Sequence, residues 1–375
     1  MRVVEVNEIE QLEAHRDDWA RLLAETPNAS FFQTLEWLSV YWHHFGQDQR
    51  LRTLLVYDDD QLKGILPLAV TNVATRGGPL RRLGYPLDAW GTQYGPIGSN
   101  PQAVLTAGLS HVQKTIRDWD LLELDWTPGN LHDEVGRSFA NIGVQPQVFS
   151  RDDISQIDLS QEWDTYWMGR HGKHRNNVRR AEKKLAEIGS VELLHWCSDG
   201  ILKSNDNAEQ HARWDLYDIC EGVAGKSWQA SAANGTTLTH GDVRPFLRDV
   251  HEVAVQRGAV SIYLLSVVGE PIAFSYNYVF GGTEYGLRMG YNLEFKSANP
   301  GTVLIHRILQ DAFAREQLVF DLGEGDSSYK HSWRTNVLPS VRFCHYAKSS
   351  LRAQALRWKR HWWGASMKPV QGRSV

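Results

Sequence analysis

The hydrophobic and polar positions of residues 284–330 predict a strand, a loop, a helix and a second strand. Apolar and aromatic residues dominate 285–291, and a polar loop then leads to Pro300-Gly301, a pair typical of a helix start. Residues 318–322 form a short apolar run typical of a buried strand. Between them, apolar residues recur near the 3.6-residue period of a helix, at Val303, Leu304, Ile308, Leu309 and Phe313. We therefore expect a β–α–β unit.

The loop before this helix has the composition of an anion site. A helix start leaves backbone N–H groups without partners and directs the positive end of the helix dipole at the loop. Ser297, Asn299 and Gly301 are small enough to let a diphosphate approach the backbone. Most helix starts bind only water, so this spacing does not by itself establish a ligand.

The N-terminal half contains the same kinds of element. Amphipathic helices are predicted over 8–24 and 30–45, a further helix over 102–117 and a strand over 121–126. The apolar runs 51–57 and 64–70 flank Asp58-Asp59-Asp60, which predicts a hairpin. Residues 76–99 are rich in Gly and Pro and are expected to form a long loop.

The second half repeats this order, which predicts two copies of one α/β domain. Expected elements are a strand over 191–196, helices near 205–221 and 243–257, and a meander of strands over 260–268, 271–280 and 283–291. A chain of 375 residues also exceeds what one core usually organises. The boundaries are placed at 1–150, 151–346 and a C-terminal tail, 347–375.

Charge and cysteine content narrow the possible partners. Seven basic residues against one acid lie in 170–184, and seven against none in 348–375, although the net charge is −4. Two basic patches on an acidic body favour anionic partners. The three cysteines contain no CxxC, so neither a disulfide framework nor a metal site is expected. Without a signal-type N-terminus or a membrane-length apolar run, we expect a cytoplasmic protein.

Several motifs occur in a fixed order along the second half. They are RNNVRRAEKKL, AGKSW, GAVSIYLLSVVGEPIAF, YGLRMGYNLEFKSANPGTVLIHRILQDA and FDLGEGDSSYKHSW. Together they resemble the GNAT-fold acetyltransferases of the CelD-type group, associated with cellulose and exopolysaccharide biosynthesis and related to the FemAB aminoacyltransferases of peptidoglycan. The resemblance is strong over 165–346 and fainter over 1–150, where the family has a degenerate first domain.

This resemblance implies two tandem GNAT domains, the first degenerate, and a donor such as acetyl-CoA or another acyl-CoA. In that fold the sheet splays after the strand assigned here to 284–291, and the pantetheine lies in the gap. Ser297, Asn299, Gly301 and Thr302 match the loop that holds the diphosphate. The chain lacks the Arg- and Gly-rich signature of ordinary GNAT loops, which leaves coenzyme A, a carrier protein and an aminoacyl-tRNA open as donor.

Acyl transfer to an amine needs a base, a stabilised carbonyl oxygen and positioned reactants. Asp321 and Glu324, at the carboxyl end of the last strand, are the candidate bases. Asp321 has the alternative role of capping the following turn, and Asp326 suits a helix N-cap. Tyr329 matches the family's YK pair and would protonate the departing thiolate, or else pack beside Trp333.

The candidates for acceptor binding are mostly basic. Lys330, the second member of the YK pair, would hold a phosphate or carboxylate of the acceptor. Arg175 and Arg179 share a helical face suited to a nucleotide-sugar, a lipid diphosphate or tRNA, or else merely solvated. Lys226 and Trp228 match another family motif. Trp228 would stack on a sugar or lipid, or be an ordinary buried Trp. His306 is expected to pack rather than act as a base.

The tail would form a helix over 351–363 with Leu351, Ala355, Trp358 and Trp362 on one face, flanked by basic residues. That pattern suits the surface of an anionic membrane, or a helix docked on the body. The function expected is transfer of an acyl group, most simply acetyl, from a thioester to an amine or hydroxyl of a sugar-containing or amino-acid-like acceptor. The expected partner is an anionic small-molecule or lipid-linked sugar acceptor. The alternatives are an aminoacyl-tRNA-dependent transferase acting on a cell-wall precursor, and a non-catalytic subunit of a polysaccharide assembly complex.

Overall fold

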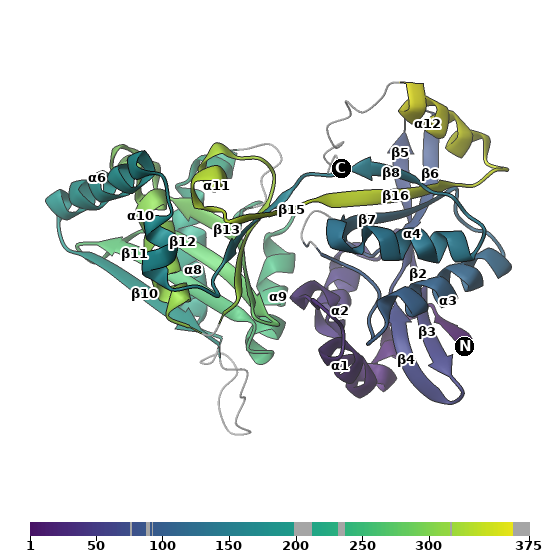
Figure 1. Cartoon of the computed structure of the whole chain (residues 1–375). Helices are drawn as coiled ribbons and strands as arrows, with labels where there is room; N and C mark the ends of the chain where they lie inside the picture. Colours follow the sequence, from purple (N-terminus) through teal and green to yellow (C-terminus); the bar gives the residue numbers. More distant parts are fainter. Residues whose placement is uncertain are drawn as a thin grey trace. The chain divides into compact units, whose positions relative to one another are not determined.

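A computed structural model describes residues 1–75, 77–87, 91, 93–198, 212–231, 237–315 and 317–362 (Figure 1). The chain divides into two compact units. Unit 1 comprises Met1–Asp152 together with the segment from Leu338 onward, and unit 2 comprises Asp153–Val337. Unit 2 contains one sheet and unit 1 contains two, and helices pack against the sheets of both units, so the chain is a mixed α/β protein.

Unit 2 is built on a seven-stranded sheet of order β10-β11-β12-β13-β14-β9-β15. Its strands are β9 (Ile154–Asp158), β10 (Val191–Cys197), β11 (Val260–Val267), β12 (Glu270–Phe280), β13 (Thr283–Tyr291), β14 (Val319–Glu324) and β15 (Asn336–Leu338). Its helices are α5 (Trp163–Met168), α6 (Gly172–Ile188), α8 (Trp214–Gly225), α9 (Arg244–Gln256), α10 (Pro300–Phe313) and α11 (Ser328–Trp333), with 3-10 turns η4 (Trp228–Ser231) and η5 (Leu293–Ala298).

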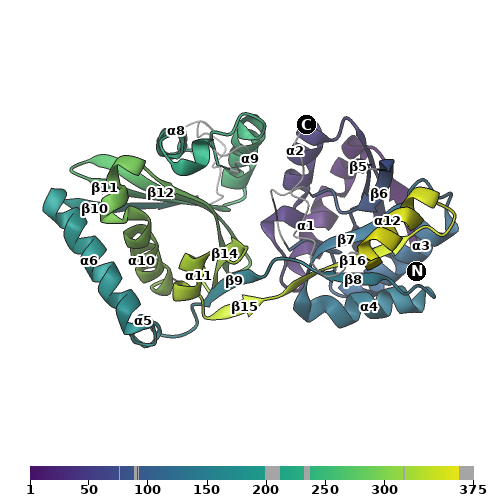
Figure 2. The same cartoon turned by 90° about the horizontal axis from the view of Figure 1, so that it is seen from above.

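Two layers of helices cover the unit 2 sheet. Helices α10 and α6 lie on one face, and α8 and α9 on the other (Figure 2). One hydrophobic core lies between the sheet and the α10 face, where Leu304 and Ile308 of α10 meet Tyr263, Leu265 and Phe320 of the strands. The expected apolar stripe of α10 is therefore confirmed, because its buried positions are those that recur with helical period.

Unit 1 contains a three-stranded sheet of order β1-β3-β4 and a six-stranded sheet of order β2-β5-β6-β7-β16-β8. Its strands are β1 (Arg2–Val6), β2 (Gln49–Leu51), β3 (Thr53–Asp58), β4 (Gln61–Leu66), β5 (Ala69–Thr75), β6 (Gly78–Gly84), β7 (Leu121–Pro128), β8 (Gln147–Ser150) and β16 (Ser340–Tyr346). Its helices are α1 (Arg16–Ala24), α2 (Leu35–Phe45), α3 (Pro101–Lys114), α4 (His132–Asn141) and α12 (Leu351–Trp362), with 3-10 turns η1 (Ile9–His15), η2 (Phe31–Gln33) and η3 (Gly129–Leu131).

The pairing of strands shows that the two units are topological copies. In unit 1, β5 pairs antiparallel with β6, α3 follows β6 in the sequence, and β7 then pairs parallel with β6. In unit 2, β12 pairs antiparallel with β13, α10 follows β13 in the sequence, and β14 then pairs parallel with β13. The strands β4 and β5 of unit 1 correspond to the single strand β12. The internal repeat expected from the order of elements is therefore confirmed.

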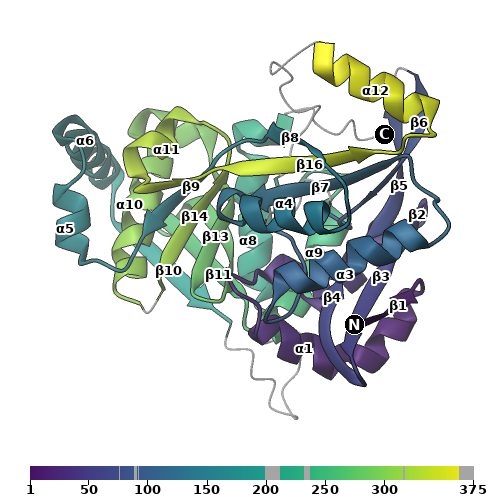
Figure 3. The same ribbon diagram turned by 45° about the vertical axis from the view of Figure 1, so that its right-hand side comes forward.

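Three expectations need correction. The domain boundary at 346 was wrong, because β16 pairs with β7 and β8 in the sheet of unit 1 (Figure 3). The long loop expected over 76–99 contains the strand β6, whose Gly and Pro content hid its pairing. The helix expected near 205–221 is described only as α8, since 199–211 lie outside the described residues.

Candidate functional site

The sheet of unit 2 opens between β13 and β14. The two strands pair over three residues each, from Thr283 to Tyr285 on β13 and from Val319 to Asp321 on β14. Beyond these pairs β13 continues to Tyr291 and β14 to Glu324 without pairing to each other. Strand edges that separate in this way present backbone N–H and C=O groups to whatever fills the gap.

A bulge on β13 lies where the separation begins. Tyr276 of β12 pairs with Arg288, and Tyr278 pairs with Tyr285, so β13 contributes one more residue than β12 over this interval. A Cβ on Gly286 would lie 2.8 Å from the ring of Phe320, which explains why glycine occupies the bulge. The bulge bends β13, and the ladder to β14 ends beside it.

The loop between the end of β13 and the start of α10 contains the residues of the predicted anion site. Asn299 adopts the left-handed conformation, with φ of +57°, immediately before the first turn of α10. Ser297 and Asn299 are exposed, and Gly301 and Thr302 are half-buried. A Cβ on Gly301 would lie 3.3 Å from the ring of Tyr291, the last residue of β13. The four residues that were predicted to bind the diphosphate therefore lie together at the end of β13.

The first turn of α10 keeps a backbone donor available. Pro300 has no N–H, and the amide of Thr302 donates to the carbonyl oxygen of Asn299 over 3.1 Å. Among the described residues the amide of Gly301 makes no hydrogen bond. Together with the helix dipole, this donor makes the loop a suitable anion site.

Helix α6 places positive charge beside this loop. The Nζ atom of Lys184 donates to the carbonyl oxygen of Ser297 over 2.9 Å. Lys184 lies in the basic run but was not among the predicted site residues, and nothing in the run distinguishes it. The two predicted arginines behave differently. Arg175 is committed to the carbonyl oxygens of Met168 and Arg170, whereas Arg179 is exposed on α6.

The predicted carboxylates lie at the end of β14. Asp321 is fully buried and accepts hydrogen bonds from the backbone N–H of Gly323 over 2.7 Å and from Nε2 of Gln156 over 3.2 Å. Its role in the turn is therefore the one the structure supports. Glu324, the last residue of β14, is half-buried. Asp326 was expected at a helix N-cap, but Ser327 occupies that position, and Asp326 pairs with His331.

The YK pair follows directly. Lys330 is buried, and its Nζ atom donates to the carbonyl oxygens of Gly323, over 3.1 Å, and Glu324. These bonds hold the end of β14, so the ammonium group is engaged by the protein rather than presented to an acceptor. Tyr329 is 44% exposed, which excludes the alternative of core packing beside Trp333.

The other predicted contacts are at the surface near the end of β13. Trp228 is 58% exposed, so it is not a buried core residue. The carbonyl oxygen of Lys226 accepts from the backbone N–H of Leu293, and its exposed Nζ atom lies 3.9 Å from Glu270. His306 packs against Trp163 and Trp167, as expected of a structural histidine.

A charged cluster lies between β10 and α10. Nδ1 of His195 is 3.1 Å from Asp311, and Nε2 is 3.0 Å from the sulfur of the exposed Cys197. Burial opposes protonation of His195, but its bonds to Asp311 and Cys197 raise its pKa to about 9. Burial likewise opposes ionisation of Asp311, but bonds from His195 and Tyr263 lower its pKa to about 2. The predictions missed this cluster because Asp311 is far in sequence from His195 and Cys197.

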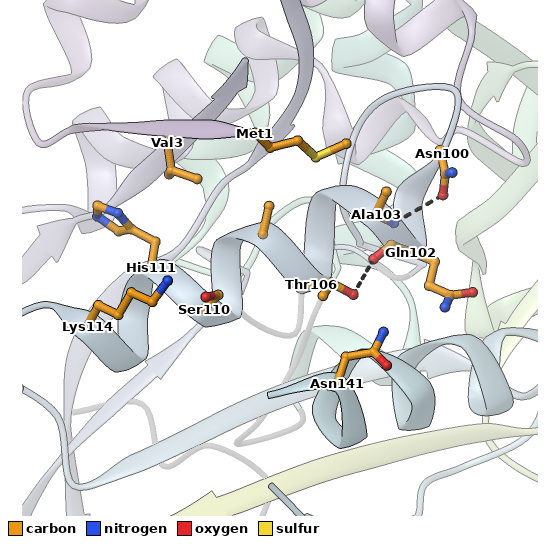
Figure 4. A pocket seen from close by; sticks show the side chains of 11 residues that line it. Met1, Val3, Asn100, Gln102, Ala103, Thr106, Ser110, His111, Lys114 and Asn141 are labelled. Carbon is orange, nitrogen blue, oxygen red and sulfur yellow. Dashed lines mark hydrogen bonds between the residues drawn. The ribbon is translucent and has the colours of Figure 1, made fainter. Parts of the chain in front are cut away.

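A separate cavity lies in unit 1. It has a volume of about 690 Å³ and is lined by residues of β1, α3 and their surroundings, including Asn100, Gln102, His111 and Lys114 (Figure 4). His111 is already paired with Glu5. None of the predicted site residues lines this cavity.

No helix among the described residues is both long enough and apolar enough to cross a membrane.

Comparisons with known proteins agree with this geometry. Residues 172–331 match the family model of the "Acetyltransferase (GNAT) domain". FemX is similar in structure with a TM-score of 0.59 and 10% identity, covering 96% of this chain and 99% of FemX. The C-terminal domain of a protein assigned as a lysylphosphatidylglycerol synthetase from Agrobacterium fabrum has a TM-score of 0.55 and 11% identity, covering 93% and 96%.

A conserved protein of unknown function from Bacteroides thetaiotaomicron is also similar, with a TM-score of 0.52 and 12% identity, covering 92% of this chain and 99% of that protein. Comparison with curated protein sequences gave no match. At these identities the solved structures support the fold alone. Residues 172–331 are similar in sequence to GNAT acetyltransferases, and unit 1 repeats the strand pairing of unit 2, so the chain has the fold of two tandem domains of this kind.

Proposed function

We propose that unit 2 transfers an acyl group, most simply acetyl, from acyl-CoA to an amine or hydroxyl of a sugar-containing or amino-acid-like acceptor. The observation that carries this proposal is the gap between β13 and β14, which opens at the bulge and ends at the first turn of α10. A thioester tether fits a gap lined by strand edges, and a diphosphate fits the helix start.

The residues present suit such a donor. The amide of Gly301, the side chain of Thr302 and the ammonium group of Lys184 would hold the diphosphate. Backbone N–H groups of the bulge would stabilise the carbonyl oxygen as it gains charge. The amine or hydroxyl attacks the thioester carbon, a new C–N or C–O bond forms, and the C–S bond to coenzyme A breaks.

Two side chains near the end of β14 would manage the protons. We assign the base to Glu324, because the carboxylate of Asp321 is committed to the turn. Tyr329, with its partly exposed side chain, would protonate the departing thiolate. Lys330 and Asp321 act as positioning residues that hold the end of β14.

The test is release of coenzyme A from acetyl-CoA with a panel of amino sugars, amino acids and lipid-linked sugars. Glu324→Gln should lower kcat by about 100-fold or more while acetyl-CoA binding is unchanged. Glu187→Gln, an exposed glutamate of α6, is the matched control and should behave as wild type. Wild-type protein that neither binds acetyl-CoA nor releases coenzyme A with any acceptor would contradict the proposal.

An aminoacyl-tRNA donor is the main alternative, because the motifs of the second half also relate the chain to the FemAB aminoacyltransferases. Transfer that is abolished by ribonuclease and independent of acyl-CoA would favour it. Acceptor binding without turnover from either donor would favour a non-catalytic subunit. The same proposal includes a place in exopolysaccharide or cell-envelope biosynthesis, which the resemblance supports. It also includes peripheral contact with the inner face of the membrane through α12, which the composition of that helix supports.

A further inference from the structure

Arg288 is a buried cation placed at the bulge of β13. In the sheet, Arg288 lies opposite Tyr276 of β12, next to the point where the pairing of β13 with β14 ends. Its neighbours lie on the face covered by α8 and α9. The ring of Tyr276 packs against Tyr217 of α8, and its hydroxyl lies 3.0 Å from Nδ1 of His251 of α9. Arg288 therefore faces the layer opposite α10.

Two nitrogen atoms of the Arg288 guanidinium group lack a hydrogen-bond acceptor among the described residues. Its residue is 5% exposed, and its Nε and Nη1 atoms are buried without a hydrogen-bond partner among the described residues. No carboxylate of those residues forms an ion pair with it. The hydroxyl of Tyr217 is also buried and has no partner in the part of the chain that the structure describes. Burial raises the pKa of Tyr217, so its hydroxyl remains a hydrogen-bond donor.

Other arginines of unit 2 show how unusual this is. Arg307 is paired with Glu182, and Arg315 with Glu284. Arg244 and Arg248, near Tyr217, share the buried carboxylate of Glu221. An unpaired buried cation costs several kcal/mol, so such a group is normally compensated. At Arg288 the compensating anion has to come from outside the described residues.

We propose that Arg288 and Tyr217 bind the carboxylate of the acceptor, and this inference rests on the function proposed above for unit 2. A guanidinium pairs in plane with the two oxygens of a carboxylate or phosphate. One uncompensated positive charge matches a singly charged carboxylate better than a doubly charged phosphate, because the nearby Arg244 and Arg248 are already neutralised. The acceptor class is therefore an amine that also carries a carboxylate, as in an amino acid or an amino-acid residue of a larger molecule.

The test is thermal unfolding of the full chain with and without L-alanine, with ethylamine as the amine that lacks a carboxylate. L-alanine should raise the midpoint of the wild type, and ethylamine should not. Arg288→Gln should raise the midpoint by a few degrees without ligand, about what removal of an uncompensated buried charge implies, and should abolish the response to L-alanine. Arg180→Gln, at an exposed position of α6, is the matched control and should respond as wild type.

A lower midpoint for Arg288→Gln without ligand, or an unchanged response to L-alanine, would overturn the assignment. A response to inorganic phosphate but not to L-alanine would overturn the carboxylate and identify a phosphate site. Arg288→Lys keeps the charge without the planar fork, so it should fold and respond more weakly than wild type. Coenzyme A binding separates the two proposals, because it should be equal in wild type and Arg288→Gln. Its absence from both would refute the proposed donor while leaving the anion result intact.

Discussion

Gly286 is the residue on which the shape of the gap depends. A Cβ there would meet the ring of Phe320 at 2.8 Å and the carbonyl oxygen of Asp321 at 3.3 Å. We expect Gly286→Ala to lower the free energy of unfolding by about 1 to 3 kcal/mol and to weaken acetyl-CoA binding, because the bulge must shift. Denaturant titration and equilibrium binding measure the two effects.

Gly222 provides the control for this substitution. It lies in α8, and a Cβ there would meet nothing within 4 Å. Gly222→Ala should leave binding unchanged and stabilise the chain by about 0.5 to 1 kcal/mol through helix propensity. Equal acetyl-CoA affinity in Gly286→Ala and wild type would contradict the importance of the bulge.

The cluster around His195 predicts a pH dependence of stability. The pKa of His195 is about 9 in the folded chain, against an ordinary value of 6.5, so the folded state binds the proton more tightly. Its contribution is complete below pH 6.5 and is lost as the pH rises to about 9. A loss of about 2 to 3 kcal/mol over this range is expected from the size of the shift. Denaturant titrations between pH 6 and 9.5 measure it.

Substitution of the partner carboxylate tests the cause. Asp311→Asn should flatten the pH dependence between 6.5 and 9, because the hydrogen bond and charge that raise the pKa of His195 are weakened. Asp133→Asn, whose partner His132 is 46% exposed, should leave the wild-type slope unchanged. An undiminished slope in Asp311→Asn would show that this cluster does not titrate as described.

At the scale of elements, the start of α10 and the side of α6 both contribute to the proposed diphosphate site. Lys184 of α6 reaches the carbonyl of Ser297 in η5, next to the first turn of α10. We expect Lys184→Ala to weaken coenzyme A binding by about 3- to 10-fold at low salt, equivalent to roughly 1 kcal/mol. The loss should shrink at high salt because exposed charges are screened.

The neighbouring Lys183 is the matched control for this prediction. Its side chain is 80% exposed, and its nearest carboxylate is Glu187 on the same helix. Lys183→Ala should change coenzyme A affinity by less than about twofold, since a solvated charge contributes little. Equal losses in the two variants would assign the effect to the general charge of α6 instead of to Lys184.

Helix α12 combines a docked face with an exposed one. Ala353 and Leu356 pack against the core of unit 1, while Leu351 and Trp358 are 88% and 61% exposed. The side chain of Trp362 and residues 363–375 lie outside the described residues. We expect wild-type protein to float with phosphatidylglycerol vesicles, and a variant with Leu351→Ser and Trp358→Ser to remain in the soluble fraction. Ile116→Ser, at a position 93% exposed, should float as wild type. Equal flotation of all three proteins would refute the membrane contact.

At the scale of the whole molecule, the two units differ in how the chain builds them. Unit 2 is one continuous segment, whereas the sheet of unit 1 needs β16 between β7 and β8. We expect the fragment 153–337 to unfold cooperatively on its own. The fragment 1–152 should lack a cooperative transition because it loses the strand that pairs with both β7 and β8. Circular dichroism during thermal unfolding measures both.

Joining 338–362 to the fragment 1–152 through a flexible linker should restore its transition, because the buried residues Phe343, Cys344 and Tyr346 return to the sheet. A fragment 1–152 that folds as well as the joined form would contradict the central role of β16.

The order of elements was predictable from sequence because it depends on local periodicity and turn residues. The period of Val303, Leu304 and Ile308, Pro300 at the first turn and the polar loop before it identified α10 and the anion loop without tertiary information. The resemblance of the surrounding motifs to GNAT acetyltransferases identified the fold. These features depend only on residues that are close together in the chain, so they can be recognised from the sequence.

The tertiary structure decided which backbone edges pair and which charges lose water. Lys330 clamps the end of β14, Arg288 is buried without a carboxylate, and β16 belongs to the other unit, although none of these differs in local pattern from an ordinary lysine, arginine or strand. Pairing and burial depend on segments far apart in the chain. Their free energies depend on what surrounds each group, and only the folded chain determines those surroundings.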